Sequence, residues 1–529
     1  MLKGKRVTRE ASGRKKSLSR KIHKWPALVI SFILIYYGVT GIMMNHRELI
    51  SGCDISAGLM PPEYRYSNWN NAAIKGGLLT GGDSLLIYGN IGVWLTDTAY
   101  SGYTQFNQGF PGGTDNHKIF DLHKADDGEM YAATLFGLYS WDTSGDRWRL
   151  LDTGEGTKGR FTAIESVGDT LYVIDRSNIY VARSDGPSTK FVRLEIPAPE
   201  GYKNDVTLFE TVWQIHSGEI LGLPGKLFVD LLGIITIFLS LTGIVYFFFP
   251  KLIKIRARKK QDISSLTDVN RWSLKWHNLT GELTFFLLGV LFLTGMFLRP
   301  PLLIAIAEAR TAPIRFSHLD QPNPWYDRLR DILYDEDNSR LFLATSEGIF
   351  SMDLPEMIPS RFRSQPPVSV MGINVFEKLE DGTFLVGSFS GLFRWDPEAE
   401  GVVDYINGLP YSDNSGGRPI GEFMATGAFR DHKGRLFAAD YNLGLSAVGH
   451  DAEIPVMPAQ LRNEQKISLW NVALEFHTAR IFQSLTGGFY ILIVPLAGIT
   501  AFAVVLSGYL ILRGRKRKKR LVKNPGYKN

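Results

Sequence analysis

The chain has 529 residues, of which 44% are hydrophobic and 21% charged, and its net charge is +6. This composition lies between that of a soluble protein and that of a fully embedded one, so we expect soluble parts attached to membrane spans. Its single cysteine, Cys53, excludes an intrachain disulfide, a thiolate cluster and a covalently attached c-type haem.

Four apolar runs are long enough to cross a bilayer, whose core of about 30 Å needs about 20 helical residues. They extend over residues 25–44, 227–249, 277–298 and 489–512. Residues 1–24, 251–275 and 513–529 together carry a net charge of +24, whereas the rest of the chain carries −18. Since Lys and Arg near span ends stay in the cytoplasm, both termini and the middle loop are expected inside. The basic surplus therefore sets topology, and we do not expect nucleic-acid binding.

The predicted fold is an α+β membrane protein with a four-helix bundle made of two duplicated hairpins. The first half is expected to contain a basic cytoplasmic tail (1–24), the first span (25–46), outer β-blades (54–210) and an interfacial segment with the second span (211–250). A basic cytoplasmic loop (251–275) follows. The second half is expected to contain the third span (276–300), further outer β-blades (312–470), an interfacial segment with the fourth span (471–512) and a basic cytoplasmic tail (513–529). Pro224-Gly225 is expected to bend the chain before the second span.

The two outer segments share a repeated pattern. Three stretches align without gaps, namely DGEMYAATLFGLYSWD from Asp127, NSRLFLATSEGIFSMD from Asn338 and DGTFLVGSFSGLFRWD from Asp381. Each predicts a strand, a tight turn and a second strand. Three weaker copies begin at Gly82, Gly168 and Lys433. The turn positions, where we expect a left-handed backbone, are Gly92, Gly137, Asn178, Gly348, Gly391 and Gly444.

Repeats of about 40–50 residues with short strands are typical of β-propeller blades. Three blades cannot close a ring, because each sheet must bury its faces against two neighbours. We therefore expect both outer segments to combine into one propeller of about six blades. Seven and eight blades are the alternative numbers. The alternative is two separate open β-domains.

Histidines cluster at the ends of the spans. The runs from His23 to Gly41 and from His277 to Gly295 are equally long, and both begin with His and end with Thr-Gly. His216 and His477 also correspond, since each precedes its apolar run by about a dozen residues.

A duplicated bundle brings equivalent residues together, and haem iron can be held by two histidines that face each other from different helices. We predict two non-covalent haems b, one on each side of the membrane, with four axial ligands. These are His23, His277, His216 and His477. The alternative is that the histidines only meet lipid headgroups, as Trp and Tyr do.

Three further residues are candidates. His46 is an alternative outer ligand, although the third span has Pro300 at the matching position. Asp230 and Glu282 fall inside or beside spans, where carboxylates are costly and often functional. They are candidates for proton uptake or for contacts behind the haem ligands. Alternatively, their side chains reach the membrane interface.

The run HSGEILGLPGKLFVDLLGIITIFLSLTG and the two His-to-Thr-Gly runs resemble the PepSY-associated transmembrane family of bacterial inner membranes. Its haem-binding members include siderophore-iron reductases. The resemblance covers the spans and their approaches, roughly a third of the chain, and implies the same four histidine ligands and a periplasmic location for the outer segments. Members often carry small α/β domains there, whereas propeller blades are expected in this chain.

The resemblance implies a di-haem b electron-transfer protein that reduces a ferric siderophore or another ferric complex in the periplasm. The loop and tails leave no room for a flavin or nicotinamide domain, so quinol or a separate reductase must donate the electrons. Reduction would loosen the iron, because hard oxygen ligands favour ferric over ferrous iron. The alternative is a non-redox membrane protein whose propeller binds a peptide, glycan or protein partner in envelope sensing or uptake.

Overall fold

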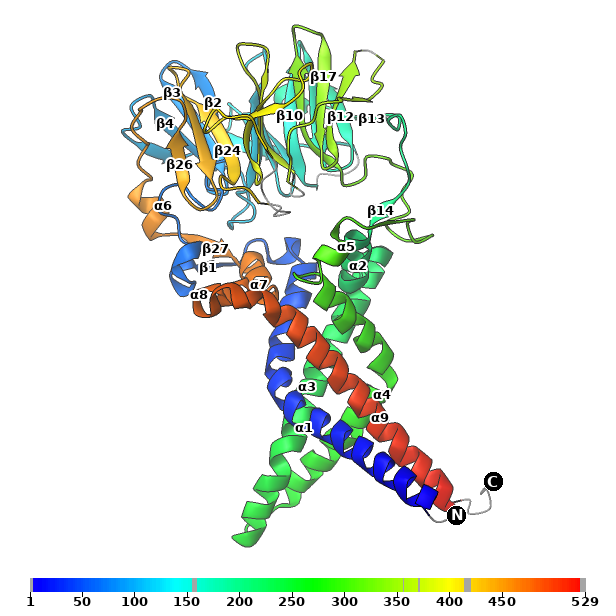
Figure 1. The fold of residues 1–529 in the computed structure, drawn as a ribbon. Coiled ribbons are helices and arrows are strands. Elements are labelled where there is room, and N and C mark those ends of the chain that lie inside the picture. Colours follow the sequence, from blue (N-terminus) through cyan, green and yellow to red (C-terminus); the bar gives the residue numbers. More distant parts are fainter. Residues whose placement is uncertain (1–2, 155–158, 355, 370–371, 413–419, 524–529) are drawn as a thin grey trace. The chain divides into compact units, whose positions relative to one another are not determined.

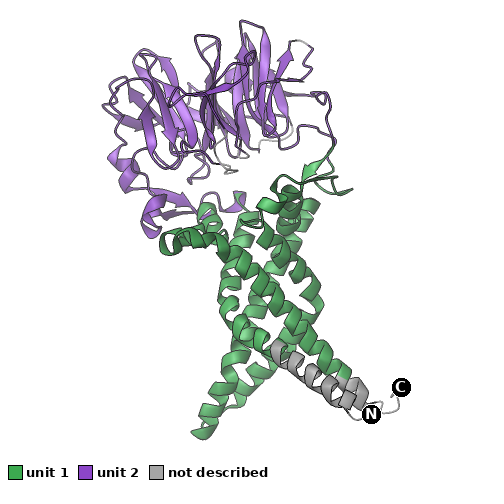
Figure 2. Ribbon diagram, in the orientation of Figure 1, with its two compact units in different colours: residues 1–47, 204–320, 470–529 green, residues 48–203, 321–469 purple. Residues whose placement is uncertain are grey.

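The computed structural model describes residues 3–154, 159–354, 356–369, 372–412 and 420–523, with side chains from Ser19 to Arg517. The chain divides into two compact units, each built from separated pieces of sequence (Figure 2). The helical unit contains residues 1–47, 204–320 and 470–529. The sheet unit contains residues 48–203 and 321–469.

Four long helices form the helical unit (Figure 1). They are α1 (Lys3–Asn45), α3 (Gly222–Arg258), α4 (Ser264–Phe297) and α9 (Ile493–Lys523). Each contains a stretch long and apolar enough to cross a membrane. Contacts run from α1 to α3, α3 to α4, α4 to α9 and α9 back to α1, so the helices close a four-helix bundle. Both α1 and α4 begin earlier than the predicted spans, because the basic segments before them continue the helix.

Shorter elements complete the helical unit. They are α2 (Leu208–Ser217), α5 (Ile304–Ala307), α7 (Leu469–His477), α8 (Gln483–Thr486), the paired strands β14 (Val206–Thr207) and β15 (Arg310–Thr311), and 3-10 helices at Glu219–Leu221, Arg480–Phe482 and Gly487–Leu492. The Thr207 side chain caps α2 by accepting a hydrogen bond from the backbone N–H of Glu210.

The chain bends before α3 at two glycines, so the prediction of a bend at Pro224-Gly225 is wrong. Gly218 and Gly222 have φ of 81° and 63°, a left-handed conformation that glycine adopts without steric cost. Pro224 lies in the first turn of α3, where its missing N–H has no helical partner to lose. A Cβ added to Gly225 would lie 2.0 Å from the carbonyl oxygen of Gly218, so only glycine allows this close approach.

In its described residues, the sheet unit contains six antiparallel sheets of three or four strands. Their strands, sheet by sheet, are β2 (Gly76–Gly81), β3 (Ser84–Gly89), β4 (Gly92–Asp97) and β5 (Tyr103–Gln105); β6 (Ile119–Lys124), β7 (Met130–Thr134), β8 (Leu138–Asp142) and β9 (Arg147–Leu150); β10 (Phe161–Val167), β11 (Thr170–Asp175), β12 (Ile179–Arg183) and β13 (Val192–Leu194); β16 (Leu329–Asp335), β17 (Arg340–Thr345), β18 (Gly348–Asp353) and β19 (Ser360–Arg361); β20 (Ile373–Lys378), β21 (Phe384–Ser388), β22 (Gly391–Trp395) and β23 (Val402–Asp404); and β24 (Ala425–Arg430), β25 (Leu436–Asp440) and β26 (Gly444–Ala447).

The remaining elements of the sheet unit lie outside these six sheets. They are the paired strands β1 (Asp54–Ser56) and β27 (Lys466–Ser468), helix α6 (Ala459–Asn463), and 3-10 helices at Glu48–Ile50, Ala57–Leu59, Pro62–Tyr64 and Gly186–Ser188.

Neighbouring sheets meet in a closed order. The first strand of each sheet contacts the first strand of the next, in the order β2, β6, β10, β16, β20 and β24, and β24 contacts β2. Clusters of buried apolar side chains fill each space between neighbouring sheets. One cluster joins Ile174 of the first outer segment to Leu341 and Leu343 of the second. Both segments therefore build one unit, and the alternative of two separate β-domains is wrong.

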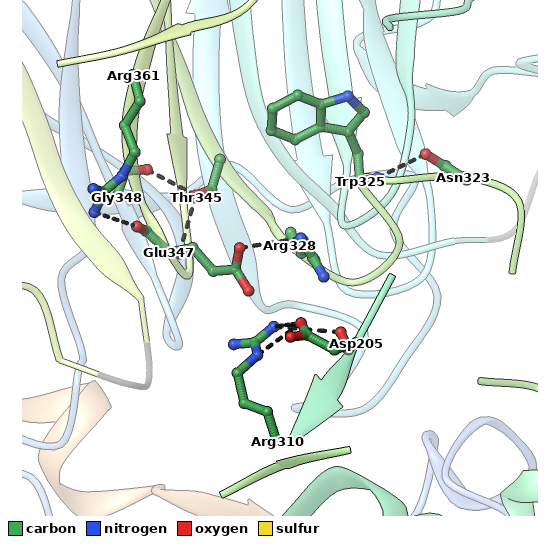
Figure 3. Close-up of polar contacts among 9 residues, drawn as sticks. All are labelled: Asp205, Arg310, Asn323, Trp325, Arg328, Thr345, Glu347, Gly348 and Arg361. Atoms are coloured by element: carbon green, nitrogen blue, oxygen red, sulfur yellow. Dashed lines mark hydrogen bonds and ion pairs between the residues drawn. The ribbon is translucent and has the colours of Figure 1, made fainter. Parts of the chain in front are cut away.

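Each predicted repeat forms the second and third strands of a sheet, joined by the predicted turn. Gly92, Gly348, Gly391 and Gly444 have positive φ, and Figure 3 shows the turn at Gly348, where its carbonyl accepts a hydrogen bond from the Thr345 hydroxyl at 2.7 Å. Neither Gly137 nor Asn178, both described residues, has positive φ, so the left-handed prediction is wrong there. At Asn178 the Asp175 carboxylate accepts the backbone N–H instead, at 2.6 Å.

We expect Leu343→Ala to destabilise the sheet unit by about 2–5 kcal/mol, because the side chain is fully buried between two sheets. The unfolding of the full-length protein in detergent, followed by tryptophan fluorescence, measures this change. Leu443→Ala is the matched control, since that side chain is 74% exposed. Equal effects of the two substitutions would contradict the assignment of this core.

Candidate functional site

The four predicted histidines come together in two pairs within the helical unit. The ring centroids of His23, on α1, and His277, on α4, are 6.1 Å apart, with 66° between the ring planes. The ring centroids of His216, on α2, and His477, at the end of α7, are 6.2 Å apart, with 56° between the planes. Each pair joins residues from two different helices.

Each of the four rings is held by the same three features of a neighbouring helix, which we call a histidine seat. A backbone carbonyl accepts the Nδ1–H, a Thr or Ser hydroxyl three residues later lies beside the same nitrogen, and the next residue, a glycine, packs against the ring. The seats are Val504, Ser507 and Gly508 for His23; Leu239, Thr242 and Gly243 for His277; Leu291, Thr294 and Gly295 for His216; and Tyr37, Thr40 and Gly41 for His477.

The distances in the seats are closely similar. From Nδ1 to the carbonyl oxygen they are 3.0 Å for His23 and 3.1 Å for both His277 and His216. From Nδ1 to the hydroxyl they lie between 3.0 and 3.4 Å. A Cβ built on the seat glycine would lie 2.6–3.5 Å from Cε1 of its histidine. At the shorter distances only glycine leaves room for the ring.

The seats explain the spacing between histidine and Thr-Gly in the apolar runs. His23 and Thr40 are seventeen residues apart on α1, and the seat containing Thr40 serves His477 rather than His23. In the same way, α4 provides His277 and, seventeen residues later, the seat of His216. Seventeen helical residues span about 25 Å, which is close to the apolar thickness of a bilayer. The repeated run therefore separates the two pairs along the bundle.

The seats determine which ring nitrogen is available. A carbonyl oxygen only accepts hydrogen bonds, so Nδ1 must carry the proton and Nε2 keeps its lone pair. For His216, which lies outside the candidate spans, burial lowers the pKa to about 4. For His477, also outside the spans, burial and the neighbouring His216 lower the pKa to about 3. Both rings are therefore neutral at physiological pH, with Nε2 free to bind a metal.

The separation of the rings fits one metal ion between each pair. Metal–nitrogen bonds of about 2.0–2.1 Å on both sides would place two opposed imidazole centroids about 6.3 Å apart. Among the described residues, no three or more His, Cys, Asp or Glu side chains are grouped to hold a metal. Each pair would therefore offer two imidazole ligands to a metal.

The other candidate residues lie elsewhere. His46 Nε2 is 2.7 Å from an Asp230 carboxylate oxygen, and Asn45 donates to the other oxygen at 2.9 Å. Glu282 forms an ion pair with Lys516. None of these contacts involves the paired histidines.

The hydroxyl residues of the seats, and the glycines that follow them, were not among the candidate residues predicted from the sequence. The hydroxyl residues are Thr40, Thr242, Thr294 and Ser507. The fourfold recurrence of a hydroxyl residue followed by glycine was the signal that could have found them.

The sheet unit contains a cavity of 360 Å³ lined mainly by the first strands of the sheets. Charged side chains of both signs line it, including Lys75, Asp121, Arg160, Glu165, Arg330 and Asp331. The Lys75 ammonium donates to the Asn374 side chain at 2.8 Å. No sequence pattern pointed to this cavity, because its residues come from all parts of the outer segments.

Burial shifts the pKa of several acids in the cavity. It raises the pKa of Asp121 to about 6 and that of Glu165 to about 7, and it raises the pKa of Asp331 well above its ordinary value. Burial also lowers the pKa of Lys75. Perturbed acids in a concave site are typical of ligand sites, so the cavity is a second candidate site.

Residues 3–249 match the model of the PepSY-associated TM region. The match includes His23 and His216, and it confirms the predicted family. Together with the four candidate spans, this match over residues 3–249 points to a multi-pass membrane protein that contains a PepSY-associated region.

Solved structures show only distant likenesses. Two of them are extracellular domains of candidate hybrid two-component systems from B. thetaiotaomicron, and each is 11% identical in sequence to this chain, with a TM-score of 0.35. Each alignment covers 73% of this chain and 40% of the other. Dihydro-heme d1 dehydrogenase NirN is 9% identical, with a TM-score of 0.28, covering 74% of this chain and 55% of its own. This chain therefore spans less than two thirds of each of these proteins. No curated protein matches the chain.

We expect Gly508→Ala to destabilise the bundle by about 1–3 kcal/mol, because the added Cβ would lie 2.7 Å from Cε1 of His23. Gly514→Ala on the same helix meets no atom within 4 Å and should be neutral or slightly stabilising. Thermal unfolding followed by helical circular dichroism compares the two. A stabilised Gly508→Ala variant would show that the ring does not need the seat.

We expect the stability of the sheet unit to fall as pH rises from about 5 to 8. Between its ordinary pKa of 4.5 and about 7, Glu165 keeps a proton in the folded state that the unfolded chain has lost. The group accounts for at most about 3 kcal/mol of this loss. Glu165→Gln should flatten the pH dependence of denaturant unfolding, whereas Glu398→Gln, an exposed position, should not.

Proposed function

We propose that this protein carries electrons across the bacterial inner membrane through two haems b, one held by His23 and His277 and the other by His216 and His477. The observation that carries the proposal is the paired arrangement of the four rings, 6.1 and 6.2 Å apart, with every Nδ1 bound to a seat. The same seat occurs four times, which favours one common role for the four histidines.

Haem fits these pairs better than a bare metal ion. Two imidazoles supply two ligands, and a porphyrin supplies the four others that iron needs. When bound, haem iron would provide one-electron redox chemistry. The protein's own contribution is to hold each ring neutral, with Nε2 directed away from its seat, and to fix the ring plane through a carbonyl and a hydroxyl on a different helix.

The charge distribution supports the proposed orientation. The basic segments 1–24, 251–275 and 513–529 would lie in the cytoplasm, so the sheet unit would lie in the periplasm. The pair of His23 and His277 would then lie at the cytoplasmic side, and the pair of His216 and His477 at the periplasmic side. The proposed electron donor is quinol or a separate reductase, which would act at the pair of His23 and His277.

The proposed acceptor is a ferric siderophore or another ferric complex in the periplasm. Reduction to ferrous iron weakens its binding to hard oxygen ligands, so one electron would release the metal.

We also propose that the six sheets are blades of a single propeller, because their first strands contact one another in a closed order. Asp230 and Glu282 have other partners, and we assign them no role in this chemistry.

The cavity in the sheet unit favours a second candidate function. Its volume of 360 Å³ and its charges of both signs suit a small polar ligand. A non-redox protein that binds a peptide, glycan or partner in envelope sensing or uptake would need such a site but no haem. The two functions differ in whether the histidine pairs bind a chromophore.

We expect the purified full-length protein from haem-replete cells to contain two haems b per chain, with a dithionite-reduced minus oxidised spectrum of b type. His277→Ala and His216→Ala should each remove about half of the haem, because each breaks one pair. Haem content measured as the pyridine complex gives the ratio.

His46→Ala is the matched control, since His46 contacts Asp230 and neither pair. It should keep both haems. A colourless wild-type protein, or loss of haem in His46→Ala but not in His216→Ala, would overturn the proposal.

A further inference from the structure

The end of the helical unit that holds the pair of His216 and His477 contains buried polar atoms without partners. Among the described residues, these include Nε of Arg299, Nε of Arg480 and the hydroxyl of Tyr37, which has the Tyr36 hydroxyl as its neighbour. Buried donors without a partner are rare in folded proteins, so each of these atoms requires an explanation.

All three residues surround the same histidine pair. The Tyr37 ring centroid is 5.2 Å from that of His477, and Arg480 follows His477 by three residues. Arg299 follows the seat glycine of His216 by four residues, and its charge interacts with both Tyr37 and Arg480. Three donors from separate segments thus gather beside one proposed haem.

The charges of this group are only partly balanced. Arg480 forms an ion pair with Glu475, so this one carboxylate serves both arginines, and the hydrogen-bond partner of Arg299 is the neutral hydroxyl of Tyr490. The guanidinium carbon of Arg299 lies 6.0 Å from the centroid of the Tyr490 ring. Burial and the nearby charge of Arg480 lower the pKa of Arg299, which means that the site as it stands disfavours the cation. An anion would relieve this cost.

The shape of the donors indicates the kind of anion. A guanidinium presents a planar fork of N–H donors that matches the two oxygens of a carboxylate, and an adjacent phenol adds a third donor. Haem b carries two carboxylates on one edge of the porphyrin. The phosphate of an anionic lipid offers similar oxygens, and the experiment below separates the two sources.

We propose that Arg299, together with Arg480 and Tyr37, binds the carboxylates of the haem held by His216 and His477. This inference rests on the proposed function. It names the residues that would bind haem with ionised carboxylates in preference to haem whose carboxylates are esterified. The buried positive charge would also favour the ferrous state of that haem, so its midpoint potential should exceed that of the haem at His23 and His277.

The test compares Arg299→Gln with wild type and with Arg310→Gln, all as full-length protein in detergent. Arg310 is the matched control, because it belongs to the same unit and pairs with Asp205 at 2.7 Å (Figure 3). Transfer of haem to excess apomyoglobin measures how tightly each haem is held, and a redox titration measures both midpoint potentials.

In Arg299→Gln, one of the two haems should leave about ten- to a hundredfold faster, and its midpoint potential should become more negative. The second haem is an internal control and should not change. Arg299→Lys keeps the charge and should hold the haem more tightly than Arg299→Gln, which separates a local effect from misfolding. Equal loss rates and potentials in wild type, Arg299→Gln and Arg299→Lys would overturn the inference.

Two further outcomes distinguish the alternatives. If the effect of Arg299→Gln occurs only after phosphatidylglycerol is added, the residue binds lipid phosphate and the inference fails. If wild type contains no haem, the proposed function fails, and this inference fails with it. Reconstitution with the dimethyl ester of haem gives a positive test, because wild type should lose the ester as fast as Arg299→Gln loses haem.

Discussion

The helical unit depends on one repeated interaction, the hydrogen bond from Nδ1–H of a histidine to a backbone carbonyl on another helix. A carbonyl inside a helix already accepts the bond from four residues later, but its second lone pair is available. The hydroxyl beside it and the glycine after it allow a ring to reach that lone pair. Without the glycine, the side chain at that position would keep the imidazole away from the helix.

This interaction links local sequence to the arrangement of the whole bundle. Each long span either presents a histidine, presents a seat, or does both, so the four rings are fixed only when the helices are correctly assembled. α1 and α4 each supply a histidine at one end and a seat at the other. The pseudo-symmetry of the two hairpins therefore has a physical basis, since each half completes the sites of the other.

Parts of this structure could be predicted because they depend on local patterns. Apolar runs with basic flanks predicted the four long helices, and alternating strands with turn residues predicted the six hairpins around which the sheets are built. Prediction was poorer where several local solutions compete. Gly218 and Gly222 form the bend that was assigned to Pro224, and the Asp175 side chain replaces the left-handed turn that was expected at Asn178. The assignment of each seat to its histidine, and the cavity, depend on contacts between distant residues, which one sequence does not reveal.

The closed order of the sheets has a consequence for synthesis. Strand β10 packs against β16, and β2 packs against β24, yet two membrane-crossing helices separate these partners in the chain. The first three sheets are therefore synthesised before the sheets of β16 and β24, which pack against the third and the first of them. Until the later sheets are synthesised and folded, two apolar faces stay uncovered, and such surfaces are prone to aggregate. Folding of this protein should consequently be limited by the late docking of the last three sheets onto the first three. It should also depend on chaperones that cover the exposed apolar faces of the first three sheets.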